Sequence, residues 1–359
     1  MIVDALITET ADRLFSEICT HDAVQDAEDR GDPGQIWEAF AETGFAWISV
    51  PEHAGGSGGS LADALEVLRL VGYHRAPIPA AETSILGGWL LAEAGLALPR
   101  GIVTVAPGHP TDSIRLVPGA SGGVEVTGTV SMVPWGRCAE RLALIVDGRV
   151  VSVAVANAVV EPQLSLAGEP RDTLIFDGAE ADVGEPPQGV DAEALRFRGA
   201  LSRVALVGGA IEKMSQLTVS YCQQRQQFGQ PIARFQAVQQ HLVWAAQDAA
   251  LARMCAESAA RQATRDTAEF EIAAAKLNAN QAATRATKAC HQAHGAMGMT
   301  QEYPLHHYSR RLWAWRSEYG GTQHWARWVG QKAVALGADR LYPLIAGGSA
   351  ELGSSGSVG

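Results

Sequence analysis

Cysteine is scarce in this sequence, and the few cysteines are isolated from one another. The chain contains no C-x-x-C pair, and its five cysteines are Cys19, Cys138, Cys222, Cys255 and Cys290. An odd number of widely spaced cysteines argues against a disulfide framework and fits reduced thiols. We therefore expect a protein of the cytoplasm.

The sequence also lacks an excess of basic residues and long apolar runs. Lysine and arginine number 28 against 39 aspartate and glutamate residues, which gives a formal net charge of −11. General nucleic-acid binders and proteins that bind anionic membranes need a basic surface, so we expect neither partner. No stretch is long enough to span a bilayer, and the amino terminus lacks the basic and apolar segments of a secretory signal. A small anionic ligand stays possible, because it needs only a local cluster of arginines.

Length and residue pattern predict several packed regions. The chain has 359 residues, of which 47% are apolar and 19% charged, and it is too long for one compact core. Residues 1–100 show apolar side chains at the three- and four-residue spacings of amphipathic helices. Residues 191–346 return to helical patterns, with alanine-rich stretches typical of a bundle. Residues 347–359 are small and polar, and we expect this tail to be disordered.

Residues 101–190 have a different texture, which predicts a β-domain. Short β-branched runs alternate there with glycine, proline and aspartate, the pattern of antiparallel strands joined by tight turns. Asp147 and Gly148 stand between two such runs and form a strong two-residue hairpin signal. Helices followed by strands and then by helices place the chain in the α+β class.

The most informative segment runs from Arg225 to Gln236. Helical patterns end at Arg225 and start again near Phe235, and Gly229 and Pro231 interrupt the helix between them. The segment therefore forms a corner between two helices.

This corner offers a distinctive set of side chains. Arg225 supplies a guanidinium, Phe228 an aromatic ring, and Gln227 and Gln236 carboxamides. Arginine pairs well with phosphate oxygens, and amides can reach ribose or ring atoms, so one hypothesis is a nucleotide site. The alternative is an ordinary turn between helices.

The corner, R-Q-Q-F-G-Q-P-I-A-R-F-Q, resembles the acyl-CoA dehydrogenase signature R-x-x-F-G-x-P-I-x-x-F-Q. A second segment, which starts at Gln292 and runs Q-A-H-G-A-M-G-M-T-Q-E-Y-P, is similar to the family pattern Q-x-x-G-x-x-G-x-x-x-E-x-P. Arginines follow this segment, as in the family. The resemblance implies the fold of that family, with an N-terminal helical domain, a middle antiparallel β-domain and a C-terminal four-helix bundle.

The resemblance also implies a reaction, for which this chain lacks one part. In the family, FAD accepts a hydride from the β-carbon of an acyl-CoA while a glutamate removes the weakly acidic α-proton. That glutamate usually precedes a G-T pair, where this chain has Gly320, and in some members it lies on an earlier helix, where this chain has Ser202. Glu318 is the nearest substitute. Its alternative role is a salt bridge to Arg316 or a neighbouring arginine.

The predicted β-domain departs from the family as well. The family's T-E-P-x-x-G-S-D-like stretch and W-I-T-like strand are replaced by residues 105–112 and 133–136. Trp135 could cover one face of a flavin or belong to the core of the domain.

This chain has the residues that contact a neighbouring subunit's FAD in the family, but it lacks those that contact the subunit's own FAD. In the family, the corner and the second segment contact FAD bound mainly by a neighbouring subunit, whereas the altered β-domain and glutamate loop serve the subunit's own flavin. The implied cofactor-binding residues are Arg225, Gln227, Phe228, Gln236, Gln292, Gly295 and Thr322. We therefore expect a subunit that completes a partner's flavin site, as in the heteromeric steroid-type acyl-CoA dehydrogenases of actinobacteria.

This interpretation implies three partners and leaves three alternatives. The partners are an acyl-CoA substrate, a second dehydrogenase subunit in an α2β2 complex, and an electron-accepting flavoprotein. The alternatives are a self-sufficient homotetramer that uses Glu318, a flavin monooxygenase on the same fold, and an interaction protein without flavin. We expect no metal site, because the sequence lacks ligand patterns that would support His291, His294, His306 and His307.

Overall fold

The computed structural model describes residues 4–119, 122–263 and 268–347. These residues form two compact units, which we call the sheet unit and the bundle unit. The sheet unit comprises the described residues of Ile2–Val71 and Arg75–Gly199, and the bundle unit comprises those of Gly72–His74 and Ala200–Gly359. The division falls within one long helix, after Gly199.

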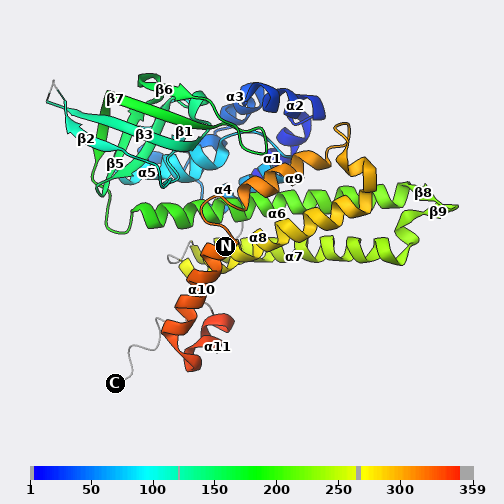
Figure 1. Ribbon diagram of the computed structural model, residues 1–359. Coiled ribbons are helices and arrows are strands. Elements are labelled where there is room, and N and C mark those ends of the chain that lie inside the picture. The colour runs from blue at the N-terminus through cyan, green and yellow to red at the C-terminus, as the bar shows by residue number, and fades with distance from the viewer. Residues whose placement is uncertain (1–3, 120–121, 264–267, 348–359) are drawn as a thin grey trace. The chain divides into compact units, whose positions relative to one another are not determined.

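The first part of the sheet unit is helical, as the apolar spacings predicted (Figure 1). Its elements are α1 Ala5–Ile18, α2 His21–Arg30, α3 Gly34–Glu42, η1 Phe45–Trp47, η2 Glu52–Ala54, α4 Leu61–Tyr73, the π-helical η3 Ala81–Gly87, and α5 Gly88–Glu93. Phe15 of α1 is fully buried and stacks on Phe40 of α3, with ring centroids 5.9 Å apart. Ser60 and Asp63 cap the start of α4 by reciprocal hydrogen bonds between side chain and backbone.

A seven-stranded sheet follows among the described residues. Its strands are β1 Val103–Val105, β2 Arg115–Pro118, β3 Val124–Pro134, β4 Arg141–Val146, β5 Arg149–Ala154, β6 Ala158–Glu161 and β7 Arg171–Gly184. The strand order is β1-β4-β5-β7-β3-β2, with β6 paired to β7. Val126, Leu144, Val153 and Phe176 belong to one buried cluster of β-branched, aliphatic and aromatic side chains. This cluster is the core that the β-branched runs of the sequence supply.

The prediction of a wholly antiparallel sheet is wrong for one strand pair. β1 and β4 run parallel, with Val103 opposite Arg141, whereas the other paired strands of this sheet are antiparallel. The long connection over residues 106–140 permits either direction, and an alternating pattern carries no information on direction.

The predicted hairpin turn at Asp147 and Gly148 is confirmed. These residues connect β4 to β5, with Val146 opposite Arg149. Their φ angles are 51° and 77°, in the left-handed region that a type I′ turn requires at both central positions.

Trp135, for which two roles were considered, lies in the core of the sheet unit. Trp135 is 2% exposed, and its backbone N–H donates to the carbonyl of Pro170 over 3.0 Å. The structure favours the core interpretation.

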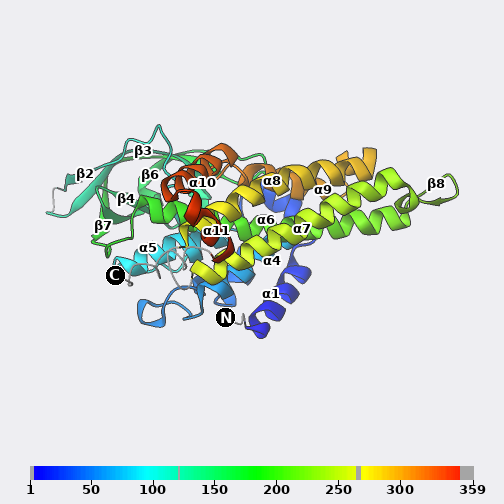
Figure 2. The same cartoon turned by 90° about the horizontal axis from the view of Figure 1, so that it is seen from below.

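The bundle unit consists mainly of long helices. Its elements are the C-terminal part of α6 Ala192–Gln224, β8 Gln226–Gln227, β9 Gln230–Pro231, η6 Ile232–Arg234, α7 Gln236–Ala263, α8 Glu269–His294, η7 Gly295–Met299, α9 Leu305–Trp315, α10 Thr322–Leu336 and α11 Ala338–Gly347. α6, α7 and α8 lie side by side in both views (Figures 1 and 2). Buried alanines such as Ala252 and Ala283 let α7 and α8 approach closely.

The order of helices, sheet and helices confirms the predicted fold class. The domain boundaries predicted near residues 100, 190 and 346 stay a prediction. The contacts within the chain divide it into two units, and the N-terminal helices belong to the same unit as the sheet. The tail expected to be disordered lies, from residue 348 onward, outside the described residues.

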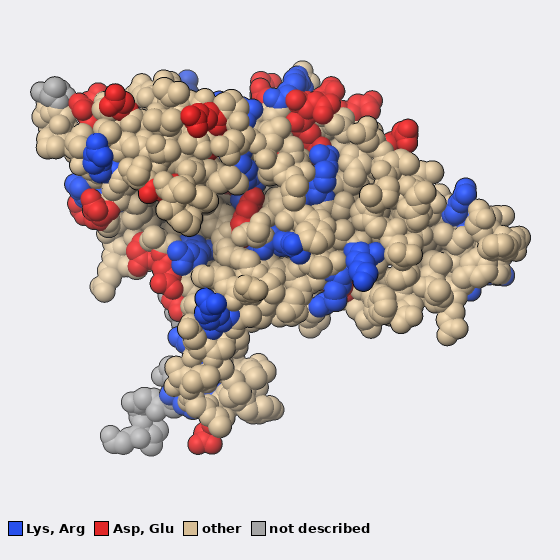
Figure 3. All heavy atoms as spheres, viewed as in Figure 1, with Lys and Arg blue, Asp and Glu red and all other residues tan. Residues whose placement is uncertain are grey.

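The distribution of charge on the surface and the apolar character of the helices were compared with the expectations from the sequence. The face seen in Figure 3 carries acidic and basic side chains interspersed, without a broad basic field. None of the described helices has the length and apolar character needed to cross a membrane.

Candidate functional site

The corner between the two predicted helices is a tight hairpin. α6 ends one residue before Arg225, and β8 and β9 pair through Gln227 and Gln230, which leaves Phe228 and Gly229 as the turn. The φ angles of the turn residues are 53° and 79°, as a type I′ turn requires. The sequence predicted the helix ends to within one residue, but it did not predict this hairpin.

The side chains of the hairpin face solvent. Phe228 is 92% exposed and packs edge-on against Phe235, with ring centroids 6.0 Å apart. Arg225, Gln227 and Gln236 are exposed as well. The bundle unit therefore presents a guanidinium, two carboxamides and an aromatic ring at its surface, a set that suits a phosphate joined to a planar ring system.

The second predicted segment lies at the same end of the bundle unit. Tyr221, one turn before Arg225, stacks on His294 near the end of α8, with ring centroids 4.5 Å apart. Gln292 is exposed on the last turn of α8, and Gly295 ends this helix with a φ of 61°. The last turns of α6 and α8 thus bring the two sequence motifs together.

His294 supports this junction as a neutral ring. It is 4% exposed, its Nδ1 lies 2.8 Å from the carbonyl of Cys290, and burial lowers its pKa. Tyr303 packs against the same ring, with centroids 4.9 Å apart. No group of three potential metal ligands occurs in the described part of the chain, and the geometry of His294 is that of a packing residue.

Thr322 lies away from this corner. It begins α10, directly after the turn at Gly320, whose carbonyl lies 3.4 Å from Nδ2 of Asn280 on α8. Asn280 precedes Gln292 by twelve residues of helix, or about 18 Å. Of the seven implied cofactor contacts, Thr322 is the one that the structure places at a different level of the bundle.

The usual position of the catalytic base is closed to a larger side chain. Gly320 has a φ of 104°, a conformation that residues with a side chain rarely adopt. A Cβ atom at this position would lie 2.6 Å from Nε1 of Trp325 and 2.8 Å from Cδ2 of His324. Trp325 is buried and donates through Nε1 to the carbonyl of Tyr319. The turn is built around a glycine.

Ser202, one of the two family base positions, and Glu318, the nearest substitute, both bind the same arginine. Arg203 is 1% exposed, its Nε donates to Oε2 of Glu318 over 2.6 Å, and its Nη1 donates to the hydroxyl of Ser202 over 3.3 Å. The guanidinium also lies over the ring of Tyr319, at 5.1 Å. Glu318 therefore forms a salt bridge, but its partner is the buried Arg203, 115 residues earlier in the chain, and not Arg316 or a surface arginine beside it in sequence.

A buried lysine holds the same turn from the other side. Lys276 on α8 is 0% exposed, and its Nζ donates to Asn280 Oδ1 at 2.7 Å and to the carbonyls of Trp315 and Arg316 at 3.1 and 3.2 Å. Burial lowers its pKa to about 7, although the carboxylate of Glu318 acts in the opposite direction. Lys276 thereby caps the carboxyl end of α9.

The sequence reasoning missed Arg203, Lys276 and Asn280. Each lies in a helical stretch rich in alanine or other apolar residues, where an isolated polar residue shows no motif. The one available signal was the position of Lys276 and Asn280 four residues apart, which places them on the same face of α8.

The comparisons with known proteins agree with this geometry. Residues 4–97 match the acyl-CoA dehydrogenase N-terminal domain, and residues 197–334 match the acyl-CoA dehydrogenase C-terminal domain. Acyl-CoA dehydrogenase FadE27 of Mycobacterium tuberculosis is 27% identical over 355 residues, which cover 89% of this chain and 94% of that protein. Acyl-CoA dehydrogenase IpdE2 of the same organism is 29% identical over 293 residues, or 79% of this chain and 82% of that protein.

A solved structure shows the same similarity. A chain of the ChsE4–ChsE5 complex from Mycobacterium tuberculosis superposes with a TM-score of 0.82 at 25% identity, over 92% of this chain and 97% of that chain. The two domain matches together span more than half of the sequence, and they contain the Arg225 corner and the Gln292 segment. The chain is therefore a member of the acyl-CoA dehydrogenase family.

Proposed function

We propose that this chain is one subunit of an FAD-dependent acyl-CoA dehydrogenase and that it completes a partner subunit's flavin site without supplying the catalytic base. The observation that carries the proposal is the Arg203–Glu318 ion pair at the place where a base is expected. The exposed corner at Arg225 supports the other half of the proposal. A relative of known structure, the ChsE4–ChsE5 complex, contains two different chains.

The chemistry of desaturation explains why a second chain is needed. Removal of the α-proton of a thioester requires an available carboxylate in a water-poor pocket. In this chain Gly320 has no side chain, Ser202 is a hydroxyl held by Arg203, and Glu318 is paired with the same guanidinium. The guanidinium of Arg203, at 2.6 Å, already engages the carboxylate of Glu318 in an ion pair. The base must then come from the partner.

The side chains of the corner are of types that can bind the ADP half of FAD. Arg225 supplies an exposed guanidinium for pyrophosphate oxygens, and Gln236 and Gln292 supply exposed carboxamides for ribose or ring atoms. Phe228 supplies a ring that is 92% exposed in this chain and that a bound cofactor or partner would cover. When bound, FAD supplies the hydride acceptor of the reaction. The role of this chain is to bind and orient that cofactor.

The remaining parts of the proposal follow from the family resemblance. The substrate would be an acyl-CoA of the kind formed in steroid breakdown, and an electron-accepting flavoprotein would be the third partner. We propose a cytoplasmic location, since all five cysteines are free thiols. Burial raises the pKa of Cys222 to about 11, which keeps this thiol protonated and unreactive.

Reconstitution with a partner tests the proposal. The chain is purified alone and after co-expression with a candidate partner dehydrogenase that carries the catalytic glutamate, and acyl-CoA oxidation is measured with an artificial electron acceptor. We expect no oxidation by the chain alone and turnover by the complex. Full activity of the chain alone, with one FAD for each chain, would contradict the proposal.

A self-sufficient enzyme that uses Glu318 is the second candidate. The observation in its favour is that the Glu318 side chain is 19% exposed on the turn next to Gly320. Glu318→Gln keeps a hydrogen-bonding group beside Arg203, so flavin content should stay constant. Our proposal expects the complex of this variant to keep its turnover. Loss of turnover without loss of flavin would favour the second candidate, and oxygen consumption by the reduced flavin would indicate a monooxygenase.

A further inference from the structure

Three rings contact one another where the two sequence motifs meet, and we call them the junction stack. They are Tyr221 of α6, His294 of α8 and Tyr303 in the segment before α9. The ring centroids of His294 lie 4.5 Å from those of Tyr221 and 4.9 Å from those of Tyr303, and the two tyrosine rings are 5.8 Å apart. The hydroxyl of Tyr303 donates to the carbonyl of Leu217 over 3.4 Å. The stack therefore joins α6 to the end of α8.

The ring of His294 is fixed in one position. It is 4% exposed, and its Nδ1 lies 2.8 Å from the carbonyl oxygen of Cys290. On the side of η7, a Cβ atom at Gly298 would lie 2.9 Å from the Cβ of His294, so the backbone of η7 closes against this residue. Close contact on all sides leaves the ring no second rotamer of equal packing.

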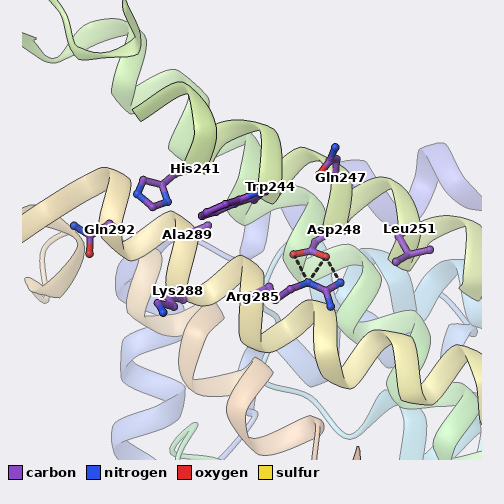
Figure 4. Close-up of a pocket in the computed structure, with 9 residues that line it drawn as sticks. All are labelled: His241, Trp244, Gln247, Asp248, Leu251, Arg285, Lys288, Ala289 and Gln292. Carbon is purple, nitrogen blue, oxygen red and sulfur yellow. Dashed lines mark hydrogen bonds and ion pairs between the residues drawn. The ribbon is translucent and has the colours of Figure 1, made fainter. Parts of the chain in front are cut away.

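The junction stack lies directly behind the implied flavin contacts. The backbone N–H of Arg225 donates to the carbonyl of Tyr221 over 2.8 Å. Gln292 precedes His294 by two residues, is exposed, and lines a pocket between α7 and α8 (Figure 4). Arg225 and Gln292 belong to different helices, so the stack that joins these helix ends sets the separation between the two side chains.

We infer that His294 is a positioning residue of the flavin site, which holds Arg225 and Gln292 at the separation that FAD needs, and that it does so as a neutral ring. This inference rests on the proposed function, since it takes the shared flavin as the ligand of the corner. His294 acts through Tyr221 and the two helix ends, without contact to the cofactor.

The hydrogen bonds of His294 require the neutral form. The carbonyl of Cys290 can only accept, so Nδ1 carries the hydrogen and Nε2 does not. Nε2 is buried and has no hydrogen-bond partner within the described part of the chain. Protonation would place a second N–H there without an acceptor, which costs free energy. Burial accordingly lowers the pKa of His294.

The surroundings of the ring offer no negative charge to balance an imidazolium. The titratable groups next to it come from α6, α8 and the segment before α9, and they are Tyr221, Cys222, Cys290, His291 and Tyr303. None of these is a carboxylate, and His306, which acts on His291, adds positive charge when protonated. Below the ordinary pKa of 6.5, the unfolded chain binds a proton that the folded junction excludes. The junction therefore loses stability as the pH falls below this value.

Two substitutions of His294 test this role in the complex with the partner. His294→Ala removes the ring, and His294→Phe keeps a ring that cannot bind a proton. His53→Ala, at an exposed histidine of η2, is the control. The dissociation constant of FAD is measured from flavin fluorescence at pH 7.5 and pH 5.5, and thermal melting checks the fold of each chain.

The wild-type complex and the control should bind FAD more weakly at pH 5.5 than at pH 7.5. Loss of the ring contacts should weaken binding by His294→Ala at least about tenfold at pH 7.5. His294→Phe should restore most of this affinity, and its binding should change less with pH than that of the wild type.

Three outcomes would overturn the inference while the proposed function stands. The first is wild-type flavin affinity of a folded His294→Ala complex. The second is a loss of flavin by His294→Phe at pH 7.5 as large as that of the alanine variant. The third, which decides the matter even if the alanine variant does not fold, is a pH dependence of His294→Phe equal to that of the wild type. If the wild-type complex binds no FAD at pH 7.5, the proposed function itself fails.

Discussion

At the scale of single residues, the site is defined by polar groups that occupy the place of a base. Arg203, Glu318 and Lys276 surround the turn before α10, and two of the three are almost fully buried. The buried guanidinium of Arg203 needs a compensating charge and hydrogen-bond partners, which Glu318 and Ser202 supply. The cluster therefore fixes the turn in a form that offers no free carboxylate.

The first prediction concerns Gly320. Gly320→Glu should not create a dehydrogenase, and it should destabilise the chain by about 1–3 kcal/mol, because φ is 104° and the new Cβ would meet Trp325. Thermal melting and acyl-CoA oxidation by the chain alone are the measurements. Gly320→Ala, which adds the same Cβ without the carboxylate, should be destabilised to a similar degree. Acyl-CoA oxidation by a Glu variant of wild-type stability would show that the turn accepts a base.

The second prediction concerns the pH dependence of stability. The pKa of Lys276 falls from 10.5 to about 7 in the folded chain. Above pH 7 the unfolded chain keeps a proton that the folded chain has lost, so the free energy of unfolding rises with pH. Lys276 should raise the free energy of unfolding by up to about 1.4 kcal/mol for each pH unit between pH 7 and pH 10.5. Well below pH 7 it should add no pH dependence, because it is protonated in both the folded and the unfolded chain.

Urea unfolding at pH 7 and pH 9 measures this effect. The wild type should gain stability over this range relative to Lys276→Met, which has no titrating group at the position. An equal change in both proteins would show that the buried ammonium does not titrate near pH 7.

At the scale of secondary-structure elements, the β8–β9 hairpin is the feature with a clear functional use. It places Phe228 in the left-handed region and leaves this residue 92% exposed, so that its ring buries little surface in the isolated chain. A strained and exposed aromatic residue is more readily explained by contact with another molecule than by folding.

The third prediction follows from this exposure. Phe228→Ala should leave the melting temperature of the isolated chain unchanged, because the ring buries little surface. In the complex with the partner it should lower flavin retention, and Phe228→Tyr, which keeps the ring, should restore most of it. Flavin fluorescence of the desalted complexes is the readout. An Ala variant with normal flavin retention would remove Phe228 from the cofactor site.

The elements were predictable from the sequence where a local pattern determines them. The Asp147–Gly148 turn and the ends of α6 and α7 follow from turn chemistry and apolar spacing. The parallel pairing of β1 with β4 was not predictable, because it depends on the path of a long connection. Arg203 and Lys276 were missed because their partners lie 115 and 39 residues away along the chain. Only the fold brings such partners together.

At the scale of the whole molecule, the chain separates two functions that the family resemblance assigns to one subunit type. The end of the bundle unit with Arg225 and Gln292 keeps exposed groups suited to FAD, while the turn at Gly320 holds no base. The proposed role of this chain is therefore that of a subunit that works on a cofactor bound by another chain.

A count of flavin per chain distinguishes a flavin site shared by two chains from a flavin site in each chain. The complex with the partner is purified, its subunit ratio is measured by quantitative amino-acid analysis, and its FAD is measured by absorbance after release. The account predicts an equimolar complex with one FAD for every two chains, and a marked loss of that FAD when this chain carries Arg225→Gln. One FAD for each chain, unaffected by this substitution, would contradict it.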